Sequence, residues 1–160
     1  QNELYSQRLN ALRILAKNNA IELYGRGWKR IISRNSLWID FWKSINAIRK
    51  VYMGECDVKL DVLSKYTFCV CFENLRLEGY ITEKIFDCFY AGCLPLYWGA
   101  VDINKFIPKE CYINVDDFGS LNEAIIFAQQ LSAGSRENMR FRDNRSTQRP
   151  QQHRIDCCRS

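Results

Sequence analysis

Five polar side chains lie close together in the middle of the chain, between two apolar segments. They are Glu73, Asn74, Tyr80, Glu83 and Lys84. The apolar run before them, residues 66–72, predicts a buried strand, and Thr82 is the expected N-cap of a helix after them. In an α/β sheet a nucleotide binds at this kind of strand-to-helix connection, because the free N–H groups at the helix start attract phosphate.

Lys84 is the most informative of these residues, because the helix dipole disfavours a cation at the start of a helix. An anion that the ammonium group neutralises would explain a lysine at this position. Glu83 can accept two hydrogen bonds from a vicinal diol, as carboxylates do with ribose, and Tyr80 offers a hydroxyl donor or a stacking face. The residues alone leave a second interpretation open, in which Glu83 and Lys84 are ordinary exposed residues of a helix.

A second candidate segment, Gly25-Arg26-Gly27, follows a short predicted strand, as a dinucleotide fingerprint would. The position of the third glycine of that fingerprint holds Arg30. The match is therefore weak, and a turn that requires a positive φ at glycine explains the segment equally well.

The chain holds eight cysteines and one histidine, His153. The cysteine spacing is irregular, unlike the disulfide frameworks of short secreted chains, so the cysteines from Cys56 to Cys111 are expected to be reduced and mostly buried. Cys69 and Cys71 are too close in sequence for a usual pair of zinc ligands. Because the histidine lies near the C-terminus, the body of the chain is not expected to hold a Ser-His-Asp or Cys-His site, or a metal site built on histidine.

Hydrophobic periodicity predicts alternating helices and strands. Helices are expected at residues 4–19, 39–48, 83–91 and 121–131, and strands at residues 20–24, 66–72, 94–98 and 113–115. This alternation predicts an α/β fold with a parallel sheet and helices on both faces. Loops that face a ligand would then lie at the carboxyl ends of the strands.

The charge is unevenly distributed along the 160 residues. Of the net charge of +5, residues 134–160 contribute +4, from seven Arg against three acidic residues, and residues 1–133 contribute +1. A nearly neutral body argues against nucleic acid as a partner. Residues 133–160 have few apolar side chains, so a domain at 1–132 is expected to be followed by a disordered basic tail. A basic arm for anionic lipid or RNA is the alternative.

No apolar run of the sequence is long enough for a membrane helix. The absence of an initial Met suggests a piece of a longer protein or a partial gene model.

Several segments together resemble the signature of the α-1,3/4-fucosyltransferases, inverting enzymes that move fucose from GDP-fucose to a sugar hydroxyl. The resemblance covers roughly residues 4–131, and it is carried by Tyr5–Arg8, Leu23–Trp28, Tyr66–Asn74, Gly79–Lys84, Ala91–Gly99 and Pro108–Phe118. Two features depart from the family pattern. Leu75 stands where many members have Ser, and the segment after residue 133 matches nothing in the family.

The resemblance implies a glycosyltransferase of the GT-B type, of which this chain would be the C-terminal, Rossmann-like half that binds GDP-fucose. Arg8 and Lys84 would then hold the pyrophosphate. Tyr80 would support the phosphates or the ribose, Glu83 the ribose hydroxyls, and Asn74 the sugar side of the donor. No cofactor is expected beyond the donor substrate, and the family does not depend on a bound divalent ion for its fold.

The chemistry of fucosyl transfer suits this set of residues. The transition state has oxocarbenium character, and negative charge builds on the departing GDP, which cations at the pyrophosphate stabilise. A carboxylate must also take the proton of the acceptor. In the family this base lies in the N-terminal domain, so no catalytic residue is expected in this fragment, and Glu73 is the one local candidate, with orientation of the loop as its alternative role. The fragment is expected to bind GDP or GDP-fucose weakly and to turn over little.

Two other classes of function remain open at this stage: a truncated nucleotide-binding module without catalysis, and a thiol-rich metal or redox domain. The glycan acceptor would be bound through the missing N-terminal domain, and the full-length protein is expected to make peripheral membrane contact. The thiols favour a reducing compartment, hence the bacterial cytoplasm or the periphery of the inner membrane, with lipopolysaccharide or protein glycosylation as the context. The lumenal side of the Golgi membrane is the alternative.

Overall fold

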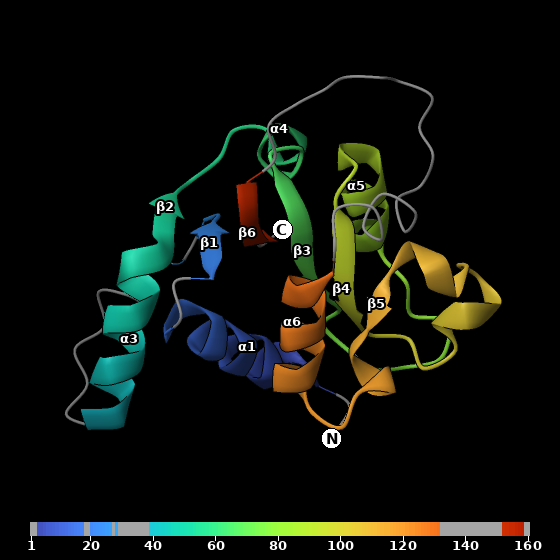
Figure 1. The fold of residues 1–160 in the computed structure, drawn as a ribbon, viewed down its shortest axis with the longest axis horizontal. Coiled ribbons are helices and arrows are strands. Elements are labelled where there is room, and N and C mark those ends of the chain that lie inside the picture. The colour runs from blue at the N-terminus through green and yellow to red at the C-terminus, as the bar shows by residue number, and fades with distance from the viewer. Residues whose placement is uncertain (1–2, 18–19, 27, 29–38, 132–151, 159–160) are drawn as a thin grey trace.

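The protein is built around one parallel sheet (Figure 1), and the computed structural model describes residues 3–17, 20–26, 28, 39–131 and 152–158. The sheet has six strands in the order β2-β1-β6-β3-β4-β5, and every neighbouring pair is parallel. The strands are β1 (Ile21–Tyr24), β2 (Tyr52–Gly54), β3 (Tyr66–Phe72), β4 (Leu94–Trp98), β5 (Ile113–Asn114) and β6 (Gln152–Cys158).

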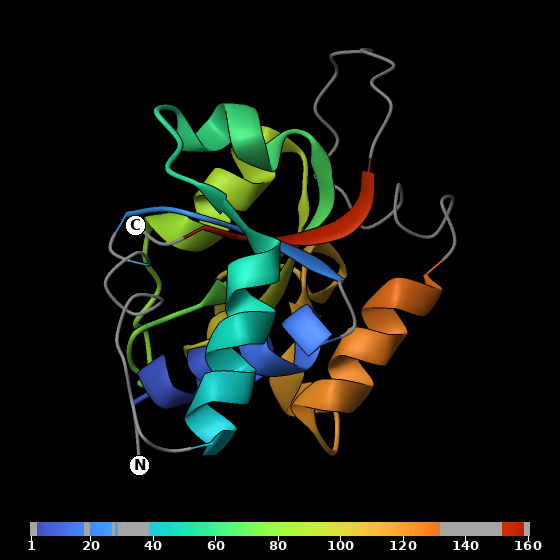
Figure 2. The same ribbon diagram turned by 90° about the vertical axis from the view of Figure 1, so that its left-hand side faces the viewer.

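Helices cover both faces of the sheet (Figure 2). One face carries α1 (Tyr5–Lys17), α3 (Ile39–Val51) and α6 (Leu121–Gln130), and the other carries α4 (Lys59–Leu63) and α5 (Glu83–Ala91). Short 3-10 helices follow β4 and flank β5: η1 (Ile103–Lys105), η2 (Lys109–Cys111) and η3 (Val115–Asp117). The expected fold class, a Rossmann-like parallel sheet with helices on both faces, is confirmed.

The central strand β3 is buried along its whole length, as its unbroken apolar sequence predicts. Its side chains alternate between two cores. Phe68, Val70 and Phe72 pack in the core that includes residues of α1 and α6. Cys69 and Cys71 pack on the opposite face, in the core that includes residues of α5.

The segments that carry the candidate site are formed as the sequence predicts. The strands at 66–72 and 94–98 and the helix at 83–91 have the expected bounds. Gly92 ends α5 in the left-handed conformation, with a φ of 71° that suits a glycine after a helix. Two short elements, β2 and α4, are not anticipated by the periodicity, because three to five residues are too few to establish a period.

The C-terminal segment differs from the expectation of a disordered tail. Residues 152–158 form β6, which lies between β1 and β3 near the centre of the sheet. The segment has few apolar side chains, but a strand inserted between two others gains backbone hydrogen bonds along both edges. The expected domain boundary at residue 132 therefore does not end the sheet, and the rest of the predicted tail, 133–151 and 159–160, lies outside the described residues.

The longest helices of the described part of the chain have 13 residues, and none there is long and apolar enough to cross a membrane.

Candidate functional site

The candidate site is organised around Glu73, the first residue after β3. Its side chain is fully buried, yet its carboxylate accepts three hydrogen bonds from the start of α5. The N–H of Thr82 donates to Oε1 over 2.9 Å, and the hydroxyl of Thr82 donates to Oε2 over 2.7 Å. These bonds satisfy a buried charge, whose burial without partners would be very costly. Glu73 therefore fixes the residue from which α5 begins.

Lys84 gives Glu73 its counter-charge. The Nζ atom lies 3.1 Å from Oε2 of Glu73, and the two side chains are 12% and 0% exposed. Nζ also donates to the hydroxyl of Thr82 over 3.2 Å. Thr82 is the N-cap residue of α5, as predicted, but its hydroxyl bonds to Glu73 rather than to the backbone of the helix. The sequence led us to expect a phosphate beside Lys84, whereas the counter-charge seen here is a carboxylate of the chain itself.

Arg8 reaches the same place from α1, 66 residues away from Asn74 in the sequence. Its Nη2 donates to the carbonyl of Phe72 over 2.6 Å and to Oδ1 of Asn74 over 3.1 Å. The start of α1 is anchored there too, because the N–H of Leu4 donates to the carbonyl of Asn74 over 3.0 Å. Two residues that sequence reasoning assigned to one site, Arg8 and Asn74, are therefore in direct contact.

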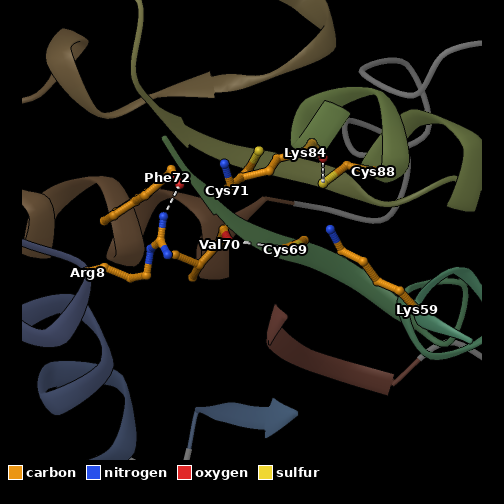
Figure 3. A pocket seen from close by; sticks show the side chains of 8 residues that line it. All are labelled: Arg8, Lys59, Cys69, Val70, Cys71, Phe72, Lys84 and Cys88. Atoms are coloured by element: carbon orange, nitrogen blue, oxygen red, sulfur yellow. Dashed lines mark hydrogen bonds between the residues drawn. The ribbon is translucent and has the colours of Figure 1, made fainter. Parts of the chain in front are cut away.

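A small pocket along β3 brings Arg8 and Lys84 together with a third cation, Lys59 (Figure 3). Its other lining residues are Cys69, Val70, Cys71, Phe72 and Cys88. In the close-up, Arg8 and Lys84 lie on opposite sides of the strand, and Lys59 lies farther along it. Three cationic side chains that border one pocket form a setting for an anion.

The three cations are not equivalent. Lys84 is paired with Glu73, and Lys59 with Asp87 of α5 at 2.9 Å. Every acceptor that Arg8 contacts in the described part of the chain is a carbonyl or an amide oxygen, all of them neutral. The uncompensated positive charge of the pocket therefore comes from Arg8, which is 9% exposed.

Tyr80 and Glu83, the other two predicted binding residues, do not line this pocket. Tyr80 is half-buried, and its N–H donates to the carbonyl of Leu77 over 3.3 Å in a turn. Glu83 is exposed and is the first residue of α5. Both lie on the chain between Glu73 and Lys84, so they border the start of the helix rather than the cavity along β3.

The weak fingerprint after β1 proves to be a turn as far as it is described. Gly25 has a φ of 121°, which favours glycine, and its N–H donates to the carbonyl of Gly54 over 3.0 Å. Arg26 is 85% exposed and 4.0 Å from a carboxylate oxygen of Glu55. Gly27 and Arg30 lie outside the described residues.

The buried cysteines form part of the core beside the pocket. Cys69, Cys71, Cys88 and Cys93 are buried and form no disulfide, whereas Cys56 and Cys111 are half-buried. Interaction with the Cys69 thiol, and then with those of Cys71 and Cys93, raises the pKa of Cys88 well above its usual range. Thiols with raised pKa values are poor nucleophiles. Among the residues described, no group of three or more His, Cys, Asp or Glu side chains is arranged to hold a metal ion.

Sequence reasoning missed three polar residues near the site: Lys59, Asp102 and Asp116. Lys59 begins a helix of five residues, which leaves little periodic signal. Asp116 belongs to the matched segment Pro108–Phe118, but nothing in the spacing of that segment indicates which side chain it contacts.

Comparison with known proteins identifies the family of the chain. The family model "Glycosyltransferase family 10 (fucosyltransferase) C-term" matches residues 1–159, which is nearly the whole chain and includes β6. The chain therefore belongs to glycosyltransferase family 10, the fucosyltransferases, and corresponds to their C-terminal region.

The individual relatives are fucosyltransferases from distant organisms. The α-(1,3)-fucosyltransferase FucT of Helicobacter pylori is 40% identical over 100 residues, which are 57% of this chain and 21% of that protein. The 4-galactosyl-N-acetylglucosaminide 3-α-L-fucosyltransferase FUT6 of Gorilla gorilla gorilla is 28% identical over 149 residues, covering 87% of this chain and 40% of that protein. The chain thus spans less than half the length of these relatives.

Solved structures show the same fold. A crystal structure of an α1,3-fucosyltransferase with GDP aligns with a TM-score of 0.56 and 23% identity, over 92% of this chain and 47% of the other. A crystal structure of an α1,3-fucosyltransferase with GDP-fucose aligns with a TM-score of 0.55 and 22% identity, over 91% and 47% of the two chains. This likeness establishes the Rossmann-like arrangement.

Proposed function

We propose that this chain is the donor-binding half of an inverting fucosyltransferase, which transfers fucose from GDP-fucose to a glycan hydroxyl in an α-1,3 or α-1,4 linkage. The observation that carries the proposal is that Arg8 and Lys84, from helices on opposite faces of the sheet, line one pocket along β3. A relative whose structure contains GDP-fucose shares the fold. The donor would place its diphosphate at the carboxyl end of β3, where the contacts of both cations converge.

Lys84 can serve a phosphate without losing Glu73. An ammonium group has three N–H donors, and two of them are directed to Oε2 of Glu73 and to the hydroxyl of Thr82. The third remains for a phosphate oxygen. The pair with Glu73 would hold the ammonium group in place before the donor arrives, so less side-chain freedom is lost on binding.

Arg8 would supply the net positive charge. Its guanidinium carries five N–H donors, and the acceptors that it contacts here lie at the end of β3. As the bond between fucose and GDP breaks, negative charge develops on the diphosphate. Cations that are already in position stabilise that charge in the transition state.

The acceptor proton requires a base that this chain does not offer in an open position. Glu73 is fully buried, and its carboxylate already accepts bonds from Thr82 and Lys84. Its geometry favours orientation of the loop over proton abstraction. In the proposed enzyme the base and the acceptor site are contributed by a part of the full-length protein outside this chain, with GDP-fucose as the sole donor and no metal in the reaction.

Calorimetric titration of the purified chain with GDP, GDP-fucose and UDP tests the proposal. We expect both guanosine nucleotides to bind and UDP to bind more weakly. Arg8→Gln should weaken GDP binding by about 1.5–3 kcal/mol, the value of a charged hydrogen bond. Lys109→Ala, which changes an exposed lysine away from the pocket, is the matched control. Equal affinity for UDP and GDP, or an Arg8→Gln variant that binds like the Lys109→Ala control, would contradict the proposal.

A nucleotide-binding module without catalysis is the second candidate, and it is favoured by the burial of the Glu73 carboxylate. A radiolabelled fucose-transfer assay with a panel of N-acetyllactosamine acceptors distinguishes the two. Nucleotide binding by a full-length protein that transfers no fucose would support the second candidate.

A further inference from the structure

The β3–α5 loop, residues 73–82, connects the buried strand to the helix that carries Lys84. Apolar burial does little to hold it, because most of its side chains from Asn74 to Gly79 are exposed, including Leu75 and Leu77 at 38% and 40%. A loop with so few buried contacts is expected to open locally at little cost in free energy unless polar contacts fix it.

Three carboxylates provide such contacts, and each follows a different strand. Glu73 follows β3 and holds the end of the loop at Thr82. Asp102 follows β4, and its Oδ1 accepts the N–H of Gly79 over 2.7 Å. Asp116 lies in η3 after β5, and its Oδ2 accepts Nη2 of Arg76 over 2.8 Å. Because the strands are parallel, all three carboxylates lie on the side of the sheet where the carboxyl ends of the strands meet.

The contact of Asp116 is itself fixed by a second bond. Its Oδ1 accepts the indole N–H of Trp98 over 3.0 Å, so the carboxylate bridges the last residue of β4 and the loop. The side chains of Arg76 and Asp116 are 41% and 27% exposed. An ion pair this exposed contributes little to the stability of the fold. The hydrogen bond between Asp116 and Trp98 would remain if Arg76 were replaced.

We propose that Asp102 and Asp116 are positioning residues of the donor site: they hold the β3–α5 loop in the conformation that presents Tyr80 and the start of α5 to the nucleotide. This inference rests on the proposed function and names residues that act on it without touching the ligand. The two carboxylates fix the loop at positions 76 and 79, on the near side of Tyr80, while Glu73 fixes its far side at 82. Loss of either contact would leave the fold intact and make the nucleotide order the loop as it binds.

The test is a calorimetric GDP titration of four proteins: the wild-type chain, Asp116→Asn, Arg76→Gln and the double variant. Asp116→Asn keeps an oxygen for the indole of Trp98 but removes the charge that holds Arg76. We expect each single variant to bind GDP about three- to tenfold more weakly, by the loss of a pre-formed loop. The double variant should be no weaker than the singles, because both act through one contact.

Asp117→Asn is the matched control, since it changes the neighbouring residue of η3 by the same charge and no hydrogen bond of its side chain is found in the described part of the chain. Hydrogen exchange at the amide of Gly79 is the second readout, and it needs no nucleotide. We expect exchange to accelerate in Asp102→Ala, which removes the acceptor, and the melting temperatures of all variants to stay within a few degrees of wild type.

The possible results distinguish a failure of the proposed function from a failure of the positioning role. A wild-type chain that binds no GDP contradicts the proposed function, whatever the loop does. A wild-type chain that binds GDP, with Asp116→Asn equal to Asp117→Asn in affinity, overturns the positioning role alone. Unchanged exchange at Gly79 in Asp102→Ala overturns the role of Asp102.

Discussion

The ammonium group of Lys84 lies 3.1 Å from the carboxylate of Glu73, and this carboxylate is the one charged group at the site with no exposure to solvent. The pair joins the end of β3 to the first turn of α5. It means that the lysine proposed to bind a phosphate is also a structural partner of the core. Substitution of Lys84 is therefore expected to change stability as well as affinity for the nucleotide.

The Lys84–Glu73 pair should show this dual role in single and double variants. Lys84→Met leaves a buried carboxylate without its counter-charge and should destabilise the chain by about 3–5 kcal/mol. Adding Glu73→Gln removes the charge while keeping an acceptor for the N–H of Thr82, so the double variant should regain most of that loss. Urea denaturation of the wild type, the two single variants and the double variant measures it. A double variant as unstable as the sum of both singles would show that the pair is not coupled.

Gly99 should not tolerate a side chain. A Cβ at this position would lie 2.5 Å from Cγ of Glu73 and would also overlap with the hydroxyl of Tyr97, which is fully buried. Gly99→Ala should cost about 1–3 kcal/mol in the free energy of unfolding. Gly119→Ala is the control, because a Cβ there would be no closer than 3.2 Å to any atom. A Gly99→Ala variant with the stability of the Gly119→Ala control would contradict the close packing around Glu73.

The contact between Asp102 and Gly79 should weaken in acid. The N–H of Gly79 lowers the pKa of Asp102 below its usual value. A group whose pKa is lowered by folding stabilises the folded state above its unfolded pKa, about 3.9 for Asp, and loses that contribution as the pH falls through the folded value. The protection of the Gly79 amide against hydrogen exchange, corrected for the intrinsic pH dependence of exchange, can be measured by NMR from pH 6 downward. It should fall only below about pH 4. The same fall in Asp102→Ala would show that another group is responsible.

The cysteines should differ in their reaction with a thiol reagent. Cys56 and Cys111 are half-buried, whereas Cys69 and Cys88 are buried in the core. The Cys88 thiol lowers the pKa of Cys69, but the Cys93 thiol and burial outweigh it and raise the pKa above its usual range. Among these four cysteines, peptide mapping after brief alkylation at pH 8 should find Cys56 and Cys111 modified in the native chain, and Cys69 and Cys88 only in denaturant. Rapid modification of Cys88 in the native protein, or retention of zinc by the purified protein, would instead favour the interpretation as a thiol-rich metal or redox domain.

The sequence was sufficient to predict the elements that carry the site. The strand at residues 66–72 is apolar throughout, and Thr82 and Gly92 mark the two ends of the helix between them, so β3 and α5 follow from local signals. The contact of Arg8 with Asn74 did not follow from such signals. It joins residues 66 positions apart, and the resemblance to a family, rather than any periodicity, suggested that both belong to one site.

Other features could not be read from the sequence because they depend on pairing in space. β6 has a polar sequence, and its place between β1 and β3 is defined by backbone hydrogen bonds. Lys59 borders the pocket from a helix of five residues, and Asp102 contacts the loop through a backbone N–H that has no sequence signature. Lys84 was expected to neutralise a bound phosphate, and the sequence did not reveal that its ammonium group also pairs with Glu73.

The central claim is that the cations along β3 receive a diphosphate. The most direct measurement is a pair of calorimetric titrations of the wild-type chain, one with GDP and one with guanosine, which lacks the phosphates. The account predicts that GDP binds at least about tenfold more tightly, by 1.4 kcal/mol or more, and that the difference shrinks as NaCl is raised and screens the charges. Equal affinity for the two ligands, unaffected by salt, would contradict it.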